Sequence, residues 1–173
     1  MGIKLLVFPE LCISSYSLSD LFRQKVVLDG SLRALEKIKN ATVSSDMLVF
    51  VGLPFYFDGS LYNCAAAVSN GSILGLVPKT NIPGYSEFYE SRHFSPAPKD
   101  ISEIVLFGER IPFGAKLPFR SAEIPEFVVG AEICEDLWVP ASPSEGLALA
   151  GATVIVNLSA SNEVIGKPEY RRS

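Results

Sequence analysis

The sequence predicts an α/β fold, built as a mixed sandwich of short strands and helices in one domain or part of one. Apolar residues make up 48% of the 173-residue chain, which is enough for a buried core. Several apolar runs end at a proline or glycine after five to nine residues, as buried strands do. At least one segment between these runs has helical spacing instead. Strands that alternate with helices indicate an α/β arrangement.

The first part of the chain contains two predicted strands and a helix. We expect strands at Ile3–Phe8 and Met47–Leu53, stopped by Pro9 and Pro54 respectively. The helix is expected over Ser31–Thr42, where leucine and isoleucine recur at helical spacing with charged residues between them.

A tight hairpin and a long loop are expected next. The segments Leu61–Ser69 and Ser72–Val77 are joined by Asn70-Gly71, a dipeptide that adopts positive φ at little cost. The stretch Pro78–Pro98 has no periodicity and contains four prolines, which indicates a long ordered loop of the kind that often serves function.

The last part of the chain contains three more predicted strands and one helix. Ile104–Phe107 and Phe127–Ile133 are expected to be strands separated by irregular chain. Ser142 is expected to cap a helix that starts at Pro143 and ends at Gly151. Thr153–Leu158 is then a further buried strand.

Composition narrows the function classes. The formal net charge of −4 argues against binding to nucleic acid or to an acidic membrane surface. Three cysteines and one histidine suggest neither a disulfide framework nor a metal site. No apolar run approaches the roughly 18–20 residues of a membrane span. We therefore expect a globular protein of the cytoplasm.

Three chemically reactive residues share a position at or just beyond a predicted strand end: Glu10, Lys79 and Cys134. Ligands of α/β folds bind at such ends, so the three side chains could converge. Together they suit acyl transfer, in which the cysteine attacks a carbonyl and the glutamate takes and returns the proton. The lysine favours the thiolate and the oxyanion.

Other interpretations stay open at this point. A single cysteine after a strand, such as Cys134, is more often part of the core than a catalyst. A dyad of Cys134 with His93 is a weaker alternative. Cys12 and Cys64 have apolar neighbours and are interpreted as packing residues.

Three motifs resemble a known family. They are Phe-Pro-Glu-Leu-Cys-Ile around Glu10, Val-Pro-Lys-Thr-Asn-Ile-Pro-Gly-Tyr-Ser-Glu-Phe-Tyr-Glu around Lys79, and Glu-Ile-Cys-Glu-Asp-Leu-Trp around Cys134. They resemble the carbon–nitrogen hydrolase, or nitrilase, superfamily. Glu-Phe-Tyr-Glu, Cys-Glu-Asp-Leu-Trp and Asn-Leu-Ser-Ala-Ser-Asn-Glu make the chain most similar to the glutaminase domains of glutamine-dependent NAD synthetases.

The resemblance implies a nitrilase-like α-β-β-α sandwich and a cysteine amidohydrolase that cleaves the side-chain amide of glutamine. It assigns Cys134, Glu10 and Lys79 as nucleophile, general base and oxyanion partner. The residues implied to bind glutamine are Tyr85, Glu135, Ser161 and Lys167. Glu135 would meet the substrate ammonium, and a buried Lys167 would meet the α-carboxylate through charge-assisted hydrogen bonds.

The resemblance also implies that residues 1–173 form a partial carbon–nitrogen hydrolase domain, incomplete at both ends. The Ser-Gly-Gly-x-Asp-Ser signature of the ATP-using synthetase domain is absent from the sequence. The glutaminase step would need no metal or cofactor, and ATP and Mg would serve only the synthetase domain. The expected partners are glutamine, that domain or full-length subunits, and further copies in a homo-oligomer. Two alternatives are a catalytically silent fragment that acts through subunit association and a stand-alone amidase of the same superfamily.

Overall fold

Nine strands form two sheets in the computed structural model, which describes residues 2–162, 164–170 and 172. The first sheet has the order β1-β2-β3-β4-β6-β5 and the second the order β7-β8-β9. The strands are β1 Leu5–Val7, β2 Leu48–Phe57, β3 Ser60–Ser69, β4 Ser72–Pro78, β5 Ser102–Leu106, β6 Glu109–Phe113, β7 Pro118–Arg120, β8 Val128–Ile133 and β9 Val154–Leu158. The helices are α1 Lys25–Ala41, α2 Pro143–Leu149 and α3 Lys167–Tyr170, with 3-10 segments at Tyr16–Arg23, Glu90–Arg92 and Cys134–Leu137.

Two-residue turns build most of the first sheet. Asp58-Gly59 joins β2 to β3, Asn70-Gly71 joins β3 to β4, and Phe107-Gly108 joins β5 to β6. All six turn residues have positive φ, as the right-handed twist of antiparallel hairpins requires. β1 pairs in parallel with β2, in the register Leu5↔Leu48.

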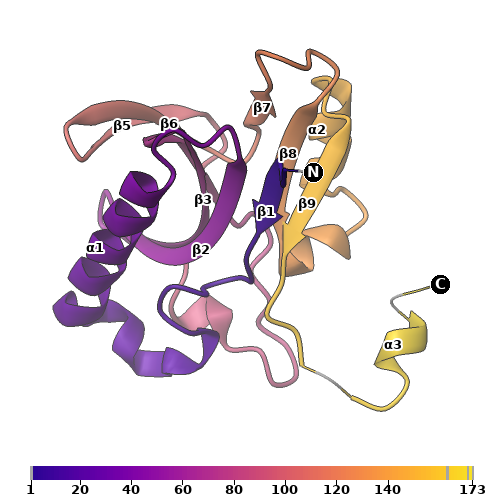
Figure 1. The fold of residues 1–173 in the computed structure, drawn as a ribbon. Helices are drawn as coiled ribbons and strands as arrows, with labels where there is room; N and C mark the ends of the chain where they lie inside the picture. The colour runs from indigo at the N-terminus through magenta and orange to yellow at the C-terminus, as the bar shows by residue number, and fades with distance from the viewer. Residues whose placement is uncertain (1, 163, 171, 173) are drawn as a thin grey trace.

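The two sheets and two helices form four layers, α-β-β-α (Figure 1). α1 packs on one face of the first sheet, and the second sheet packs on the opposite face. α2 covers the outer face of β8, where Gly130 lets Leu147 approach closely: a Cβ at Gly130 would lie 2.9 Å from a Leu147 methyl carbon. The predicted sandwich is confirmed.

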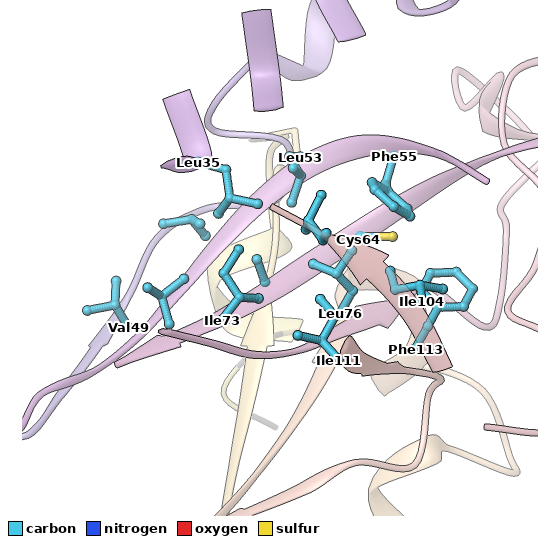
Figure 2. Packing of buried hydrophobic residues seen from close by; sticks show 14 residues of the cluster. Leu35, Val49, Leu53, Phe55, Cys64, Ile73, Leu76, Ile104, Ile111 and Phe113 are labelled. Atoms are coloured by element: carbon cyan, nitrogen blue, oxygen red, sulfur yellow. The ribbon is translucent and has the colours of Figure 1, made fainter. Parts of the chain in front are cut away.

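Two apolar cores lie between these layers. Figure 2 shows the core between α1 and the first sheet, a cluster that includes Leu35 of the helix and Val49, Leu53 and Leu76 of the sheet. The second core lies between the sheets and includes Phe50, whose ring meets that of Phe119 edge-on at 5.6 Å.

Pro54 does not end its strand, contrary to the sequence prediction. β2 continues to Phe57, and Pro54 pairs with Asn63 of β3. The carbonyls of Phe50 and Gly52 accept hydrogen bonds on the β1 side of β2, so alternation along the strand turns the Pro54 nitrogen to that side too. β1 has already ended there, at Val7. The missing N–H therefore breaks no ladder hydrogen bond.

Other expectations need smaller corrections. α1 begins at Lys25, six residues before the predicted start. Leu28 of the added turns packs against a buried cluster that includes Leu11 and Phe22, and this packing outweighs the weak helix propensity around Gly30. The chain expected to be irregular between β5 and β8 contains β6 and β7. Cys64 is buried as predicted, whereas Cys12 is exposed. The Asn70-Gly71 hairpin and the Ser142-capped helix are confirmed.

Candidate functional site

Glu10 lies on a loop that crosses directly over β2. A Cβ at Gly52 would lie 2.3 Å from the Leu11 backbone nitrogen, so only glycine leaves room for this crossing. The Ile13 backbone N–H donates to the Gly52 carbonyl at 3.0 Å and fixes the loop there. The result is a Glu10 carboxyl that is only 2% exposed.

Lys79 follows β4 directly and is completely buried. Its ammonium lies 2.8 Å from a carboxylate oxygen of Glu10 and 2.7 Å from one of Glu90. Glu90 is itself buried and begins the short 3-10 segment in the long loop. One buried cation is thus shared by two buried carboxylates.

Two further polar side chains complete this cluster. The Asn63 amide of β3 donates to Glu10 Oε1 at 2.7 Å and to Glu90 Oε2 at 3.4 Å. The Tyr16 hydroxyl donates to Glu90 Oε1 at 2.8 Å. Glu10 Oε2 also accepts a hydrogen bond of 3.1 Å from the backbone N–H of Ala160, a residue in the loop after β9. The carboxylates therefore have fixed orientations as well as charge partners.

Cys134 begins the turn after β8, and its φ of 46° lies in the left-handed region. The Asn157 amide of β9 donates to the Cys134 carbonyl at 3.3 Å and holds this strained backbone. The side chain is 9% exposed. Burial and the nearby charge of Glu10 raise the pKa of the thiol to about 11, against the opposing effect of Lys79. The thiol is therefore protonated at neutral pH and needs a base to become a nucleophile.

The same burial acts on the two partners of Cys134. Burial raises the pKa of Glu10, and Lys79 and Asn63 only partly offset this. Burial lowers the pKa of Lys79, but the carboxylates of Glu10 and Glu90 outweigh it, so the net shift is upward. Lys79 therefore stays charged while Glu10 is suited to accept a proton.

Asp136, two residues after the cysteine, is a third buried carboxylate beside this cluster. It accepts from the backbone N–H groups of Thr80, Asn81 and Ile133. Burial raises its pKa, and these donors oppose the shift.

Two of the four predicted substrate-binding residues contact each other. The Tyr85 hydroxyl donates to the Glu135 carboxylate, at 3.0 Å from each oxygen. Tyr85 and Lys167 line one shallow pocket of about 430 Å³. Lys167 is half-buried, not buried as expected, and its ammonium donates to Asn162, whose amide donates to Glu87. Ser161 is half-buried in the loop after β9.

The structure places His93 in a different environment from the thiol. Its ring contacts those of Phe22 and Phe94, with centroid distances of 5.8 and 6.3 Å. The groups that act electrostatically on Cys134 are Glu10, Lys79 and Glu90. The contacts of His93 therefore do not support the dyad. Within residues 2–162, 164–170 and 172, no three His, Cys, Asp or Glu side chains form a group that could hold a metal ion.

No site role was predicted from the sequence for Glu90, Asn63, Tyr16 or Asp136, although Glu90 and Asp136 lie within the motifs Glu-Phe-Tyr-Glu and Cys-Glu-Asp-Leu-Trp. Glu90 lies in a loop without periodicity, and Asn63 occupies one position of an otherwise apolar strand. For Asn63, the available signal was a polar residue that interrupts a buried strand, because buried amides need hydrogen-bond partners.

The architecture and the buried site define a class of protein. The four-layer sandwich matches a solved Saccharomyces cerevisiae structure described as Nit3, a member of branch 10 of the nitrilase superfamily, with a TM-score of 0.65. That match has 21% identity and covers 96% of this chain and 55% of the yeast chain, so it concerns the fold alone. The carbon–nitrogen hydrolase family model matches residues 1–170. The chain belongs to the carbon–nitrogen hydrolase family.

Two further proteins narrow the similarity. The chain is 43% identical over 173 residues to a glutamine-dependent NAD(+) synthetase of Mycobacterium bovis, with 99% of this chain and 25% of that protein covered. A solved glutamine-dependent NAD(+) synthetase from Cytophaga hutchinsonii matches with a TM-score of 0.83 and 29% identity, over 98% of this chain and 27% of that one. The chain thus spans about a quarter of the length of the curated relatives it matches. Its resemblance to their glutaminase region is confirmed.

Proposed function

We propose that this chain hydrolyses the side-chain amide of glutamine to glutamate and ammonia. The observation that carries the proposal is the buried cluster of Glu10, Lys79 and Glu90 beside a protonated cysteine. The similarity to glutamine-dependent NAD(+) synthetases supports glutamine as the amide.

Each residue of the cluster has a role in this reaction. Glu10 takes the Cys134 thiol proton as the sulfur attacks the amide carbon, and the Lys79 ammonium stabilises the oxyanion that forms. Glu10 then gives the proton to the leaving nitrogen, and ammonia departs. A water molecule, deprotonated by Glu10, cleaves the glutamyl thioester and restores the thiol. Glu90 keeps the Lys79 ammonium charged and in place.

The remaining predicted residues bind the amino acid end of glutamine. Glu135 pairs with the substrate ammonium, and Tyr85 orients that carboxylate through its hydroxyl. Lys167 pairs with the α-carboxylate, after its ammonium exchanges Asn162 for the substrate. Ser161 offers a hydroxyl in the adjoining loop. This assignment uses both charges of a free amino acid.

The wider role follows from the same similarity. Residues 1–173 supply a partial carbon–nitrogen hydrolase domain, and the ammonia serves NAD synthesis from deamido-NAD in a synthetase domain that uses ATP and Mg. The glutaminase step itself needs no cofactor. The partners are that domain or full-length subunits, in a homo-oligomer of the cytoplasm. No helix among the described residues has the length and apolar character needed to cross a membrane.

Glutamate release from glutamine tests the proposed reaction. The chain should release glutamate, and Cys134→Ala should fall to the background rate because no other group can form the thioester. Asparagine and a simple aliphatic amide are the comparison substrates. Equal rates with Cys134→Ala, or a preference for the aliphatic amide, would contradict the proposal.

A further inference from the structure

Asp136 connects the two halves of the proposed site. Its carboxylate is 1% exposed and is held by four N–H donors. Oδ1 accepts from the Asn81 backbone at 2.7 Å, from the Asn81 side chain at 2.9 Å and from the Thr80 backbone at 3.2 Å. Oδ2 accepts from the Ile133 backbone at 3.1 Å.

These donors come from both sheets. Thr80 and Asn81 directly follow Lys79, at the end of β4 in the first sheet. Ile133 directly precedes Cys134, at the end of β8 in the second sheet. One carboxylate thus joins the segment that carries the cation to the turn that carries the thiol.

Between their strands the sheets meet through apolar contacts, and polar links such as Ala160 to Glu10 and Tyr85 to Glu135 lie in the loops beyond the strands. Among these links, Asp136 is the one that bonds directly to the residues next to both Lys79 and Cys134. Val77 of β4 packs against side chains of β8 such as Ala131 and Ile133. Apolar burial is not directional, so it leaves small sliding movements of one sheet over the other weakly opposed. Hydrogen bonds depend on distance and angle and do oppose such movement.

We propose that Asp136 is a positioning residue that sets the spacing between the Lys79 ammonium and the Cys134 thiol. This inference rests on the proposed function, since it assigns the spacing a role in thiol reactivity. Asp136 itself touches no reacting atom. It acts through the backbone on either side.

Asp136→Asn is the informative substitution. It keeps the shape of the side chain but replaces one acceptor oxygen by an NH₂ group, which then faces N–H donors. One side of the link is lost, and the cation and thiol move relative to each other. Lys79 lowers the pKa of the thiol, so a looser spacing raises it further.

The test measures the rate of Cys134 alkylation by iodoacetamide against pH, by peptide mass spectrometry in a Cys12→Ser background because Cys12 is exposed. Asp136→Asn should move the midpoint upward by about one pH unit. It should also lower kcat for glutamine by about 10²-fold with little change in KM. Asn81→Ala removes only one of the four donors and should shift the midpoint in the same direction by less. The midpoint of Asn81→Ala tests the inference if Asp136→Asn does not fold.

The matched control is Thr42→Val. Thr42 is also buried, and its hydroxyl accepts from the Gly71 backbone and donates to the Lys39 carbonyl, at the other end of the β3–β4 hairpin. The Thr42→Val substitution should reduce the stability of the fold without moving the alkylation midpoint of Cys134. An unchanged midpoint in the Asp136 and Asn81 variants, or an equal shift in Thr42→Val, would overturn the inference. Glutamate release by the unsubstituted chain is measured separately. If it is absent, the proposed function fails, whatever the alkylation midpoints of the variants show.

Discussion

At the scale of single residues, the site holds a thiol in its protonated form close to Glu10, the carboxylate proposed as its base. Two buried carboxylates, Glu10 and Glu90, share the one cation of Lys79, so the buried cluster is negative overall when all three are ionised. That excess negative charge adds to burial in opposing a thiolate at Cys134. In the proposed mechanism, proton transfer from Cys134 to Glu10 would leave the net charge of the cluster unchanged, because it neutralises a carboxylate as the thiolate forms.

The pH dependence of Cys134 alkylation should separate the two charges. Lys79→Met removes the cation that lowers the pKa of the thiol, so the alkylation midpoint should rise above about 11. Glu10→Gln removes a negative charge that raises this pKa, so the midpoint should fall. Both variants should nevertheless lose glutamine hydrolysis by at least about 10²-fold. Shifts of the same sign in the two variants would contradict this electrostatic account.

At the scale of elements, the sequence was sufficient where local chemistry decides the structure. Asn70-Gly71 forms its hairpin, and Ser142 caps α2, because positive φ and an N-cap acceptor are properties of the residues themselves. Pro54 was misinterpreted because its effect depends on which neighbouring strand is present. Glu10, Lys79 and Cys134 could be grouped from their places at strand ends. Glu90 and Asp136 lie in connecting segments whose path cannot be predicted from hydrophobic periodicity.

The crossing of the Glu10 loop over β2 gives a prediction for Gly52. Gly52→Ala places a methyl group against the backbone of Pro9 and Leu11, which cannot rotate away. We expect a loss of about 1–3 kcal/mol in the free energy of unfolding, together with loss of glutamine hydrolysis. Urea denaturation and glutamate release measure the two effects.

Gly30→Ala is the matched control for that substitution. Gly30 lies inside α1, where an added Cβ meets only an Arg33 side-chain nitrogen at 3.8 Å. Alanine should stabilise the helix by up to about 1 kcal/mol and leave activity intact. A Gly52→Ala variant as stable and active as Gly30→Ala would show that the loop does not need this close crossing.

At the scale of the whole molecule, the site exists only where the two sheets meet. Glu10 and Lys79 come from the first sheet and Cys134 from the second, so the core between the sheets must hold both in place. Its residues Phe50 and Val129 are completely buried. The chain spans about a quarter of its curated relatives, and within that quarter the structure brings the proposed catalytic residues into one buried site.

Phe50→Ala tests how much the inter-sheet core contributes. The substitution leaves a cavity beside Phe119 and should reduce the free energy of unfolding by about 3–5 kcal/mol, measured by urea denaturation. Tyr56→Ala, at a side chain that is 53% exposed on the same strand, should change it by less than about 0.5 kcal/mol. Equal losses in the two variants would contradict the placement of this core.

If Cys134 attacks the glutamine side-chain amide, a covalent glutamyl intermediate forms on its sulfur and can be trapped. The chain is mixed with glutamine, quenched in acid within the first turnovers and digested for peptide mass spectrometry. We predict a glutamyl group in thioester linkage on Cys134, absent from Cys134→Ala and absent when glutamate replaces glutamine. Release of glutamate with no glutamyl group on Cys134 at any quench time, or release that persists in Cys134→Ala, would contradict the account.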